Sequence, residues 1–473
     1  MAPRVGIKLM FARFGLIVIG LFACSIAMEA QTGDNAVYNS SGNCSGSSPC
    51  ASSPAFIDAS VFAQSGSNIC KLLNGILSGT GFPTTGAVID ARGLPFTTPA
   101  TSMTCTTTNP SPWYGISGPP PSTILLPATT SAAPISIPST WVLPPNTHLI
   151  GEGDTVSSSG TIGTTIQAKS SFSGSMIQFG SSSCLPPLGG ASACPGISVE
   201  NLILDGQGQS ITGISNQYSA DQSYVDHVSL YQILGTGLSV SGSATNSGPY
   251  SNITFDTGNE SSASSTVCAQ ILNAGGTRGI HGLNCISESN VPLAAVLLDS
   301  SNNSIEDVRI VGFYDGIRIG ANGNAQSNVL FNIIGDTTAS GVTPIIVVHI
   351  ADVGHTVTDL SVMGANNAGG SSGTITIKDD LTGAQLTDTS VGIYALGNTG
   401  TGNYYSRFTT SSSVASWVVG PSAPSGSCAE GSLYSCIGNS SLNGSGCTNG
   451  TADFALWACA YNSSASLLWR PVI

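Results

Sequence analysis

Asp299, Arg318, His349 and Lys378 lie within or just after short segments in which apolar residues alternate with others. That period of two is typical of a β-strand with one buried face. When the segments are aligned on their buried residues, Arg318 points outward, and Asp299, His349 and Lys378 come together just past their strands. The residues taken as buried are Val296, Ile317, Ile346 and Ile375. Such a column of acid, imidazole and amine could bind or process an acidic polysaccharide. The alternative is that these charges only decorate a solvated turn.

A second candidate is the pair Asp226 and His227, within Tyr224-Val225-Asp226-His227-Val228-Ser229. This stretch resembles the Trp-Ile-Asp-His stretch of calcium-dependent pectate lyases, with Tyr224 in place of Trp. The resemblance implies catalytic roles for Asp226 and His227 and leaves Ca²⁺ open as a cofactor whose ligands are unknown. The Arg-x-Pro-x-x-Arg motif of those lyases is absent, as are the intact aspartate signatures of pectin hydrolases. The alternative is that both residues occupy turn and ladder positions.

A short phrase recurs in the sequence: an apolar residue, any residue, then Asn, Asp or His, followed by alternating apolar residues. Asp226 and His227 lie in one copy of this phrase, and the other candidates lie in the alternating segments between copies. This repeat begins with Val199-Glu200-Asn201-Leu202 and returns about every 21 to 31 residues up to Leu360. Its central apolar residues are Leu202, Val228, Ile253, Leu283, Val308, Val329 and Leu360. Each repeat matches one coil of a solenoid, whose stacking buries a continuous core. The Asn, Asp or His is expected at a sharp bend, where stacked side chains form a hydrogen-bonded ladder.

The segments before the repeat suggest a capped solenoid. Ile69, Leu72, Leu73, Ile76 and Leu77 recur at helical spacing and predict an amphipathic cap helix. The stretches 123–127 and 141–153 resemble the first coils of pectate-lyase-superfamily proteins. Together with the repeats, this resemblance covers roughly residues 58–400 and implies an all-β, right-handed parallel β-helix of the pectin-lyase-like kind. It implies a carbohydrate-facing side but no specific reaction.

The first thirty residues have the layout of a secretory signal. Arg4, Lys8 and Arg13 precede an apolar run that ends at Ala27, and this run is too short to span a bilayer. We therefore expect a secreted or cell-surface protein without a transmembrane helix after signal removal. The alternative is a lipoprotein attached through Cys24. The formal net charge of −13 argues against nucleic acid as a partner.

The cysteines predict disulfides, because thirteen residues become twelve without Cys24 and the chain enters an oxidising compartment. Sequence alone does not determine their connectivity. The expected local pairs are Cys44–Cys50, Cys70–Cys105, Cys184–Cys194 and Cys268–Cys285, with further pairs among Cys428, Cys436, Cys447 and Cys459. No Cys-x-x-Cys pair is present, which argues against a structural zinc site.

The sequence thus predicts five parts: a signal peptide (1–30), a flexible segment (31–57), the parallel β-helix (58–410), a linker (411–427) and a small Cys-rich β module (428–473). The expected function is binding, with or without cleavage, of an extracellular acidic polysaccharide. An enzyme of this kind would be a polysaccharide lyase or a glycoside hydrolase. The alternative is a non-catalytic cell-surface or spike-like β-helix that recognises glycans or partners. The oligomeric state stays open.

Overall fold

The computed structural model describes most of residues 55–409, together with six strands between residues 417 and 471. The gaps before residue 410 are 65–66, 81, 95–100, 158–159, 185–193, 243–245, 259, 261–263, 274–275, 289–290, 337–345, 352, 369–374, 381–383, 387–389 and 399–402. Side chains are described up to residue 380. The predicted signal peptide and the pair Cys44–Cys50 lie outside these residues, as do the side chains of the C-terminal module.

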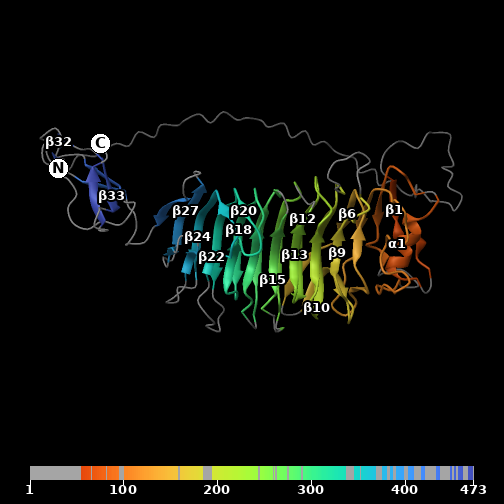
Figure 1. Cartoon of the computed structure of the whole chain (residues 1–473). Coiled ribbons are helices and arrows are strands. Elements are labelled where there is room, and N and C mark those ends of the chain that lie inside the picture. The colour runs from red at the N-terminus through yellow and green to blue at the C-terminus, as the bar shows by residue number, and fades with distance from the viewer. Residues whose placement is uncertain are drawn as a thin grey trace, which may run out of the picture. The chain divides into compact units, whose positions relative to one another are not determined.

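Two sheets, one of 16 strands and one of 10, contain most of the described strands (Figure 1). The main path of the first sheet runs through β1 (Ala55–Asp58), β2 (Ala87–Asp90), β3 (Ser122–Leu125), β6 (Thr147–Ile150), β10 (Ser198–Gln209), β12 (Tyr224–Ile233), β14 (Tyr250–Asp256), β16 (Ile280–Ile286), β18 (Ser304–Val311), β21 (Val329–Asp336), β24 (Leu360–Asn367), β27 (Ser390–Asn398) and β28 (Asn403–Thr409). Joined to its side are β4 (Ile135–Ile137), β7 (Asp154–Ser157) and β8 (Gly160–Ala168).

The second sheet runs through β5 (Trp141–Leu143), β9 (Ser175–Phe179), β11 (Thr212–Asn216), β13 (Thr236–Ser241), β15 (Val267–Leu272), β17 (Ala294–Asp299), β19 (Asp315–Ile319), β22 (Ile346–Ile350), β25 (Ile375–Asp379) and β26 (Ala384–Leu386). A two-stranded pair joins β20 (Ala325–Gln326) to β23 (Val357–Thr358). Separate small sheets contain β29 (Trp417–Gly420), β30 (Leu433–Cys436), β33 (Leu456–Tyr461) and β34 (Leu467–Pro471), and β31 (Thr448–Asn449) with β32 (Ala452–Asp453).

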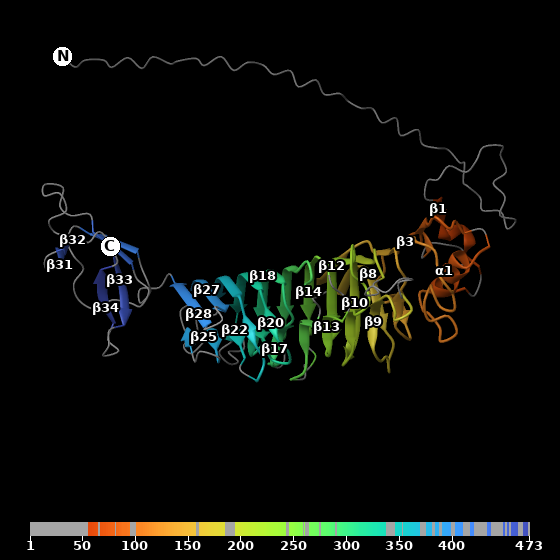
Figure 2. The ribbon, with the colours of Figure 1, turned by 45° about the horizontal axis from the view of Figure 1, so that its top comes forward.

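The strand order is that of a parallel β-helix. From β10 to β25 the chain alternates between the sheets, apart from the separate pair β20 and β23. Each of these strands pairs in parallel with its counterpart one coil earlier, as β12 does with β10 and β13 with β11. Both views show these strands stacked in chain order (Figure 2). Apolar residues at matching positions bury themselves between the sheets, and the first sheet stacks Leu202, Val228, Ile253, Leu283, Val308, Ile333 and Ala365. The predicted all-β, parallel β-helix architecture is confirmed.

From β10 to β24, each strand on the main path of the first sheet bends at a left-handed residue. Asn201, His227, Asn252 and Asp307 occupy this row with φ between 52° and 55°. Side chains there bond between coils, since Asn252 donates to Asp226 at 2.9 Å. Asn, Asp and Gly tolerate this conformation best.

Two repeats are shifted relative to the sequence analysis. Val308 pairs with Ile333, not with Val329, and Ile333 pairs with Ala365, not with Leu360. The Asn328 phrase belongs instead to another corner, where Asn328 Oδ1 accepts from the backbone N–H of Asn303 at 2.9 Å. Both corners place a polar residue before apolar ones, which is why the phrase alone did not separate them.

The antiparallel strands β26, β27 and β28 follow the last parallel strands in their sheets. The helix α1 (Ile69–Leu77) forms over the predicted residues, with Asn68 as its N-cap. Its apolar side is buried, which accounts for its amphipathic pattern. Its role as a solenoid cap stays a prediction.

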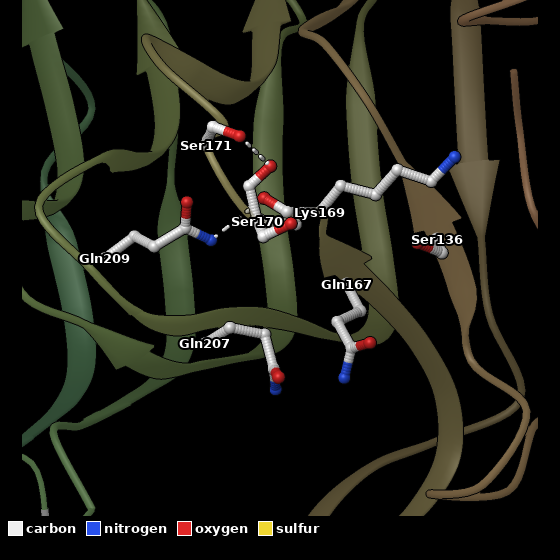
Figure 3. A pocket seen from close by; sticks show the side chains of 8 residues that line it. Ser136, Gln167, Lys169, Ser170, Ser171, Gln207 and Gln209 are labelled. Carbon is white, nitrogen blue, oxygen red and sulfur yellow. Dashed lines mark hydrogen bonds between the residues drawn. The ribbon is translucent and has the colours of Figure 1, made fainter. Parts of the chain in front are cut away.

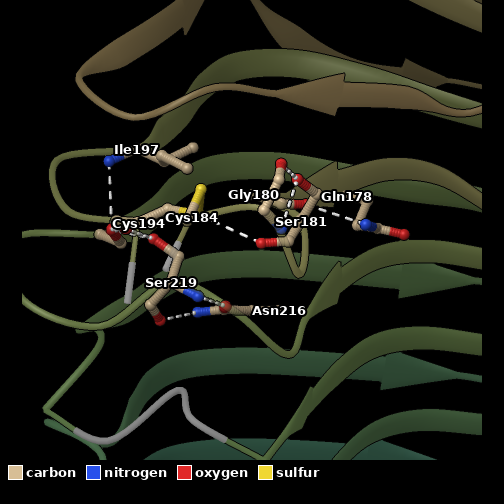
Figure 4. The surroundings of a disulfide bond; sticks show 10 residues. Gln178, Gly180, Ser181, Cys184, Cys194, Ile197, Asn216 and Ser219 are labelled. Carbon is tan, nitrogen blue, oxygen red and sulfur yellow. Dashed lines mark hydrogen bonds between the residues drawn. A yellow bond between two sulfur atoms is a disulfide. The ribbon is translucent and has the colours of Figure 1, made fainter. Parts of the chain in front are cut away.

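Three of the expected disulfides are present, namely Cys70–Cys105, Cys184–Cys194 and Cys268–Cys285. The Cys184–Cys194 bond lies beside Gly180, which has a φ of 67° (Figure 4). A Cβ at Gly180 would collide with Cys194 Sγ, so only glycine fits there. Cys268 in β15 and Cys285 in β16 are fully buried, so their bond links the two sheets through the interior.

Candidate functional site

Arg318, His349 and Lys378 occupy one row across three neighbouring strands of the second sheet. Arg318 in β19 pairs with His349 in β22, which pairs with Lys378 in β25. The flanking residues Ile317, Val348 and Ile377 point into the core. Because side chains alternate along a strand, the three charged residues share the outer face of the sheet. With Asp315 and Asp380 they form what we call the His349 cluster.

The His349 ring lies between two carboxylates. Nδ1 is 2.8 Å from Asp315 Oδ2, and Nε2 is 2.9 Å from Asp380 Oδ2. Two acceptors at opposite nitrogens favour the doubly protonated imidazolium, which donates to both. Burial, the largest single influence, lowers the pKa of His349, but the hydrogen bonds to Asp315 and Asp380 outweigh it and raise that pKa overall. The surroundings of His349 therefore favour the cationic form of its imidazole.

Lys378 and Asp380 form the solvent side of the cluster. Lys378 Nζ lies 3.0 Å from Asp380 Oδ1, and the two side chains are 26% and 35% exposed. Burial tends to raise the pKa of Asp380, yet the hydrogen bonds from His349 and Lys378 together hold it below its ordinary value. Asp380 is thus an ionised carboxylate held by two cationic groups at the surface.

Asp315 and Arg318 form the inner side. Asp315 is fully buried, and its Oδ2 lies 3.4 Å from the guanidinium nitrogen Nη1 of Arg318. The Arg318 side chain is 19% exposed. Asp315 Oδ1 and Arg318 Nε are buried, and neither has a hydrogen-bond partner. Buried polar atoms without partners cost free energy, and such atoms are expected at ligand sites. The cluster contains three cationic and two anionic groups when His349 is protonated.

Asp299 does not join this row, contrary to the sequence alignment. Val296 and Ile317 do pair, but their counterparts in the next coils are Val348 and Ile377. Ile346 and Ile375, used in the alignment, instead pair with Asp315 and with each other. The shift of two residues keeps every side chain on its predicted face, so only the position along the strand changes. Asp299 is buried and accepts a hydrogen bond from Asn322 at 3.0 Å.

Asp315 and Asp380 were not among the site residues predicted from the sequence. Asp315 occupies a row whose other members include Ala294, Ile346 and Ile375. A carboxylate in an apolar row requires a buried cationic or hydrogen-bonding partner, and this was the signal available in the sequence. Asp380 follows β25 directly, within an Asp379-Asp380 pair that the sequence places after a strand.

Asp226 and His227 lie elsewhere, on β12 of the first sheet. His227 Nδ1 is 2.9 Å from Asp226 Oδ2, and the side chains are 53% and 36% exposed. His227 is the left-handed bend residue of its coil, with a φ of 52°. The pair therefore occupies the turn position that the sequence analysis gave as the alternative to catalysis.

A hydrogen-bonded chain next to that pair was not foreseen. His148 Nδ1 lies 2.8 Å from Ser198 Oγ, and Ser198 donates to Glu200 at 2.7 Å. The Tyr224 hydroxyl also donates to Glu200, at 2.8 Å. Burial, followed by this hydrogen bond, raises the pKa of Tyr224. Glu200 therefore accepts hydrogen bonds from two hydroxyl groups on neighbouring strands.

Within the described part of the chain, no three His, Cys, Asp or Glu side chains are grouped so as to hold a metal ion. The ligands of the Ca²⁺ ion that the sequence left open are therefore not identified among these residues. Nor does any helix in that part have the length and hydropathy required to cross a bilayer.

No protein-family model and no curated protein matches the sequence. Three solved structures are similar at TM-scores of 0.30 to 0.32. ORF18 of Geobacillus virus E2 is 11% identical, and the match covers 88% of this chain and 86% of that one. The A-module of the mannuronan C-5 epimerase AlgE4 of Azotobacter vinelandii is 11% identical (69% and 92% covered). The DFA-IIIase of Arthrobacter chlorophenolicus, in complex with DFA-III, is 8% identical (65% and 84%).

Scores this low carry no argument about function. The resemblance to pectate-lyase-like proteins is confirmed for the architecture, since the strand pairing of this chain is itself that of a parallel β-helix.

Proposed function

We propose that the protein binds an acidic polysaccharide on the outer face of its second sheet, through the His349 cluster. The observation that carries the proposal is the imidazolium of His349, held between Asp315 and Asp380 beside Lys378. Only twelve Lys and Arg residues occur in the sequence, and two of them, Arg318 and Lys378, belong to this cluster. This concentration of cationic groups supports recognition of an anion by an otherwise acidic chain.

The Asp380 carboxylate suggests how a uronic acid would bind. It is the most exposed anion of the cluster, and it accepts hydrogen bonds from both His349 and Lys378. The carboxylate of a uronic acid unit has the same charge and the same two acceptor oxygens. It would therefore replace Asp380 at His349 Nε2 and Lys378 Nζ, while Arg318 remains on the same face to bind a further oxygen.

Binding is favoured over proton abstraction, because an imidazole that is already protonated cannot act as a base. Cleavage is a second candidate, favoured by the hydrogen bond between buried Asp315 and His349 Nδ1. A carboxylate in that position orients the ring and stabilises the imidazolium. Once Asp380 is displaced, His349 could donate its Nε2 proton to the departing oxygen of a glycosidic bond. Both a lyase and a hydrolase use such an acid.

The test measures binding and turnover on the same purified full-length protein. Polygalacturonate, alginate and an uncharged glucan are titrated, and unsaturated products and new reducing ends are followed. We expect saturable binding of an acidic polymer that is weakened at least tenfold in His349→Ala, because that variant loses a charged hydrogen-bonding group. Binding of no acidic polymer, or equal binding by His349→Ala, would refute the proposal.

Product formation would establish the enzymatic candidate, and retained binding without products would leave the recognition function alone. Asp299→Ala serves as the matched control, since Asp299 lies on the neighbouring coil but outside the cluster. Its binding is expected to equal that of the unmodified protein.

A further inference from the structure

A hollow of about 460 Å³ lies far along the solenoid from the His349 cluster. It is formed by the end of β8, the segment that follows it, the tail of β10, and Ser136 in β4 (Figure 3). Its side chains are those of Ser136, Gln167, Ala168, Lys169, Ser170, Ser171, Gln207 and Gln209. Most of these residues carry an amide or a hydroxyl group, and the volume falls in the range of pockets that hold small molecules.

A buried carboxylate fixes two of these amides. Asp205 is 5% exposed and accepts hydrogen bonds from the side-chain nitrogens of Gln167 at 3.0 Å and Gln207 at 2.6 Å. The backbone N–H of Gln207 donates to the same carboxylate at 2.9 Å. Because each amide directs its nitrogen to Asp205, its carbonyl oxygen is left as the acceptor group for a ligand. The two acceptors are held in place before any ligand arrives.

The other two long polar side chains of the lining, Lys169 and Gln209, form hydrogen bonds with the backbone. Lys169 Nζ donates to the carbonyl of Cys105 at 2.5 Å, and Figure 3 shows the lysine side chain extending away from Gln207 and Gln209. The amide of Gln209 donates to the carbonyl of Lys169 at 3.1 Å and accepts from the backbone N–H of Phe172 at 3.0 Å. Gln209 therefore holds the backbone of the segment around Lys169 and Phe172 in place, and the Lys169 ammonium is bonded to a backbone carbonyl.

From this arrangement we propose that the hollow binds an uncharged sugar unit. Hydroxyl groups of a sugar donate to the fixed carbonyl oxygens of Gln167 and Gln207, and they exchange hydrogen bonds with the exposed hydroxyls of Ser170 and Ser171. A carboxylate-bearing sugar is disfavoured, because Asp205 and the two carbonyl oxygens present negative charge, and the Lys169 ammonium is directed away from them to the carbonyl of Cys105. The site thus has the opposite preference to the His349 cluster and does not depend on it.

The test titrates the full-length protein with cellotetraose, xylotetraose and mannotetraose, and with trigalacturonate as the charged comparison, by ligand-observed NMR. We expect at least one uncharged tetrasaccharide to bind. Its affinity should fall about fivefold or more in Gln167→Ala and in Gln207→Asn, since each loses a fixed acceptor. Asparagine at position 207 shortens the side chain and still tolerates the φ of 54° found there.

Ser170→Trp provides a second variant, because residue 170 is exposed and a large side chain there would fill the hollow without disturbing the core. Gln326→Ala removes an exposed glutamine from another coil and should bind like the unmodified protein. Binding that survives Ser170→Trp unchanged would overturn the proposal. So would the absence of binding by all three uncharged sugars, or tighter binding of trigalacturonate that these variants weaken. His349→Ala should leave this binding intact, so failure here is distinguishable from failure at the His349 cluster.

Discussion

His349 and Asp315 are 34 residues apart in sequence, yet His349 Nδ1 lies 2.8 Å from a carboxylate oxygen of Asp315, because the two residues start from adjacent strands of one sheet. Asp315 is fully buried and His349 nearly so. If the imidazole rotated to expose Nδ1 to solvent, the buried carboxylate of Asp315 would lose this hydrogen bond. This contact fixes which nitrogen of the ring faces outward, toward Asp380 and Lys378.

The stability of the protein should depend on pH through this contact. The pKa of His349 is raised above its ordinary value of 6.5. The ring thus binds its proton more tightly in the folded state than in the unfolded state. The stabilisation of the fold that results is fully present below pH 6.5. That stabilisation is lost as pH rises through the higher folded pKa. The pKa of Asp380 is lowered from 3.8, so its contribution is present above that pH and is lost as pH falls through its folded pKa.

The two effects together predict that the cluster stabilises the fold most between about pH 3.8 and 6.5. Urea unfolding at pH 5.5, 7 and 9, compared between the unmodified protein and His349→Gln, measures this. The difference in unfolding free energy should shrink toward alkaline pH. A difference that stays constant across that range would show that His349 is not charged in the folded protein.

Removing the charge of Asp380 should tighten the binding of acidic polysaccharide. In Asp380→Asn the side chain keeps its size but no longer competes for His349 and Lys378, so affinity should rise roughly two- to fivefold, the scale of an exposed ion pair. The pKa of His349, followed by NMR, should fall in the same variant, because one of its two carboxylate acceptors is gone. Asp336→Asn, which removes a surface carboxylate paired with Arg309 on the first sheet, is the control. Weaker binding by Asp380→Asn would mean that Asp380 contacts the ligand directly.

Replacing the cationic groups should weaken binding and reduce its dependence on salt. Arg318→Gln and Lys378→Gln should each cost about tenfold in affinity for the acidic polymer, since each removes a charged donor. The slope of affinity against salt concentration should also decrease, because fewer charges interact with the polymer. Arg309→Gln alters an exposed arginine on the other sheet and should change neither quantity. Equal losses of affinity in all three variants would indicate that the polymer binds surface cations without preference for the His349 cluster.

The faces of the strands could be predicted from the sequence, but the register between coils could not. The period of two assigns Arg318, His349 and Lys378 to the outer face, and a shift of two residues leaves that assignment intact. The same shift removes Asp299 from the row, because the segments joining the coils differ in length and the apolar pattern fits more than one alignment. Asp315 could not be assigned for a related reason, since its closest partner, His349, comes from the next coil and only the stacking shows this contact.

The bend row gives the final prediction, which separates a structural role for His227 from a catalytic one. Its φ of 52° is left-handed. Asparagine adopts this conformation in the same row at Asn201, Asn252 and Asn332, whereas a β-branched residue is strained there. His227→Asn should leave thermal stability nearly unchanged, and His227→Val should lose about 1–2 kcal/mol of unfolding free energy. Ser251→Val, on the adjacent strand in an extended conformation, is the control and should be tolerated. If His227→Asn remains folded yet abolishes turnover of a polysaccharide, His227 acts in the chemistry. If the activity of His227→Asn is unchanged, the role of the histidine is to form the bend. The Asp226 carboxylate then has a structural role too, because it accepts the hydrogen bond from Asn252 on the next coil.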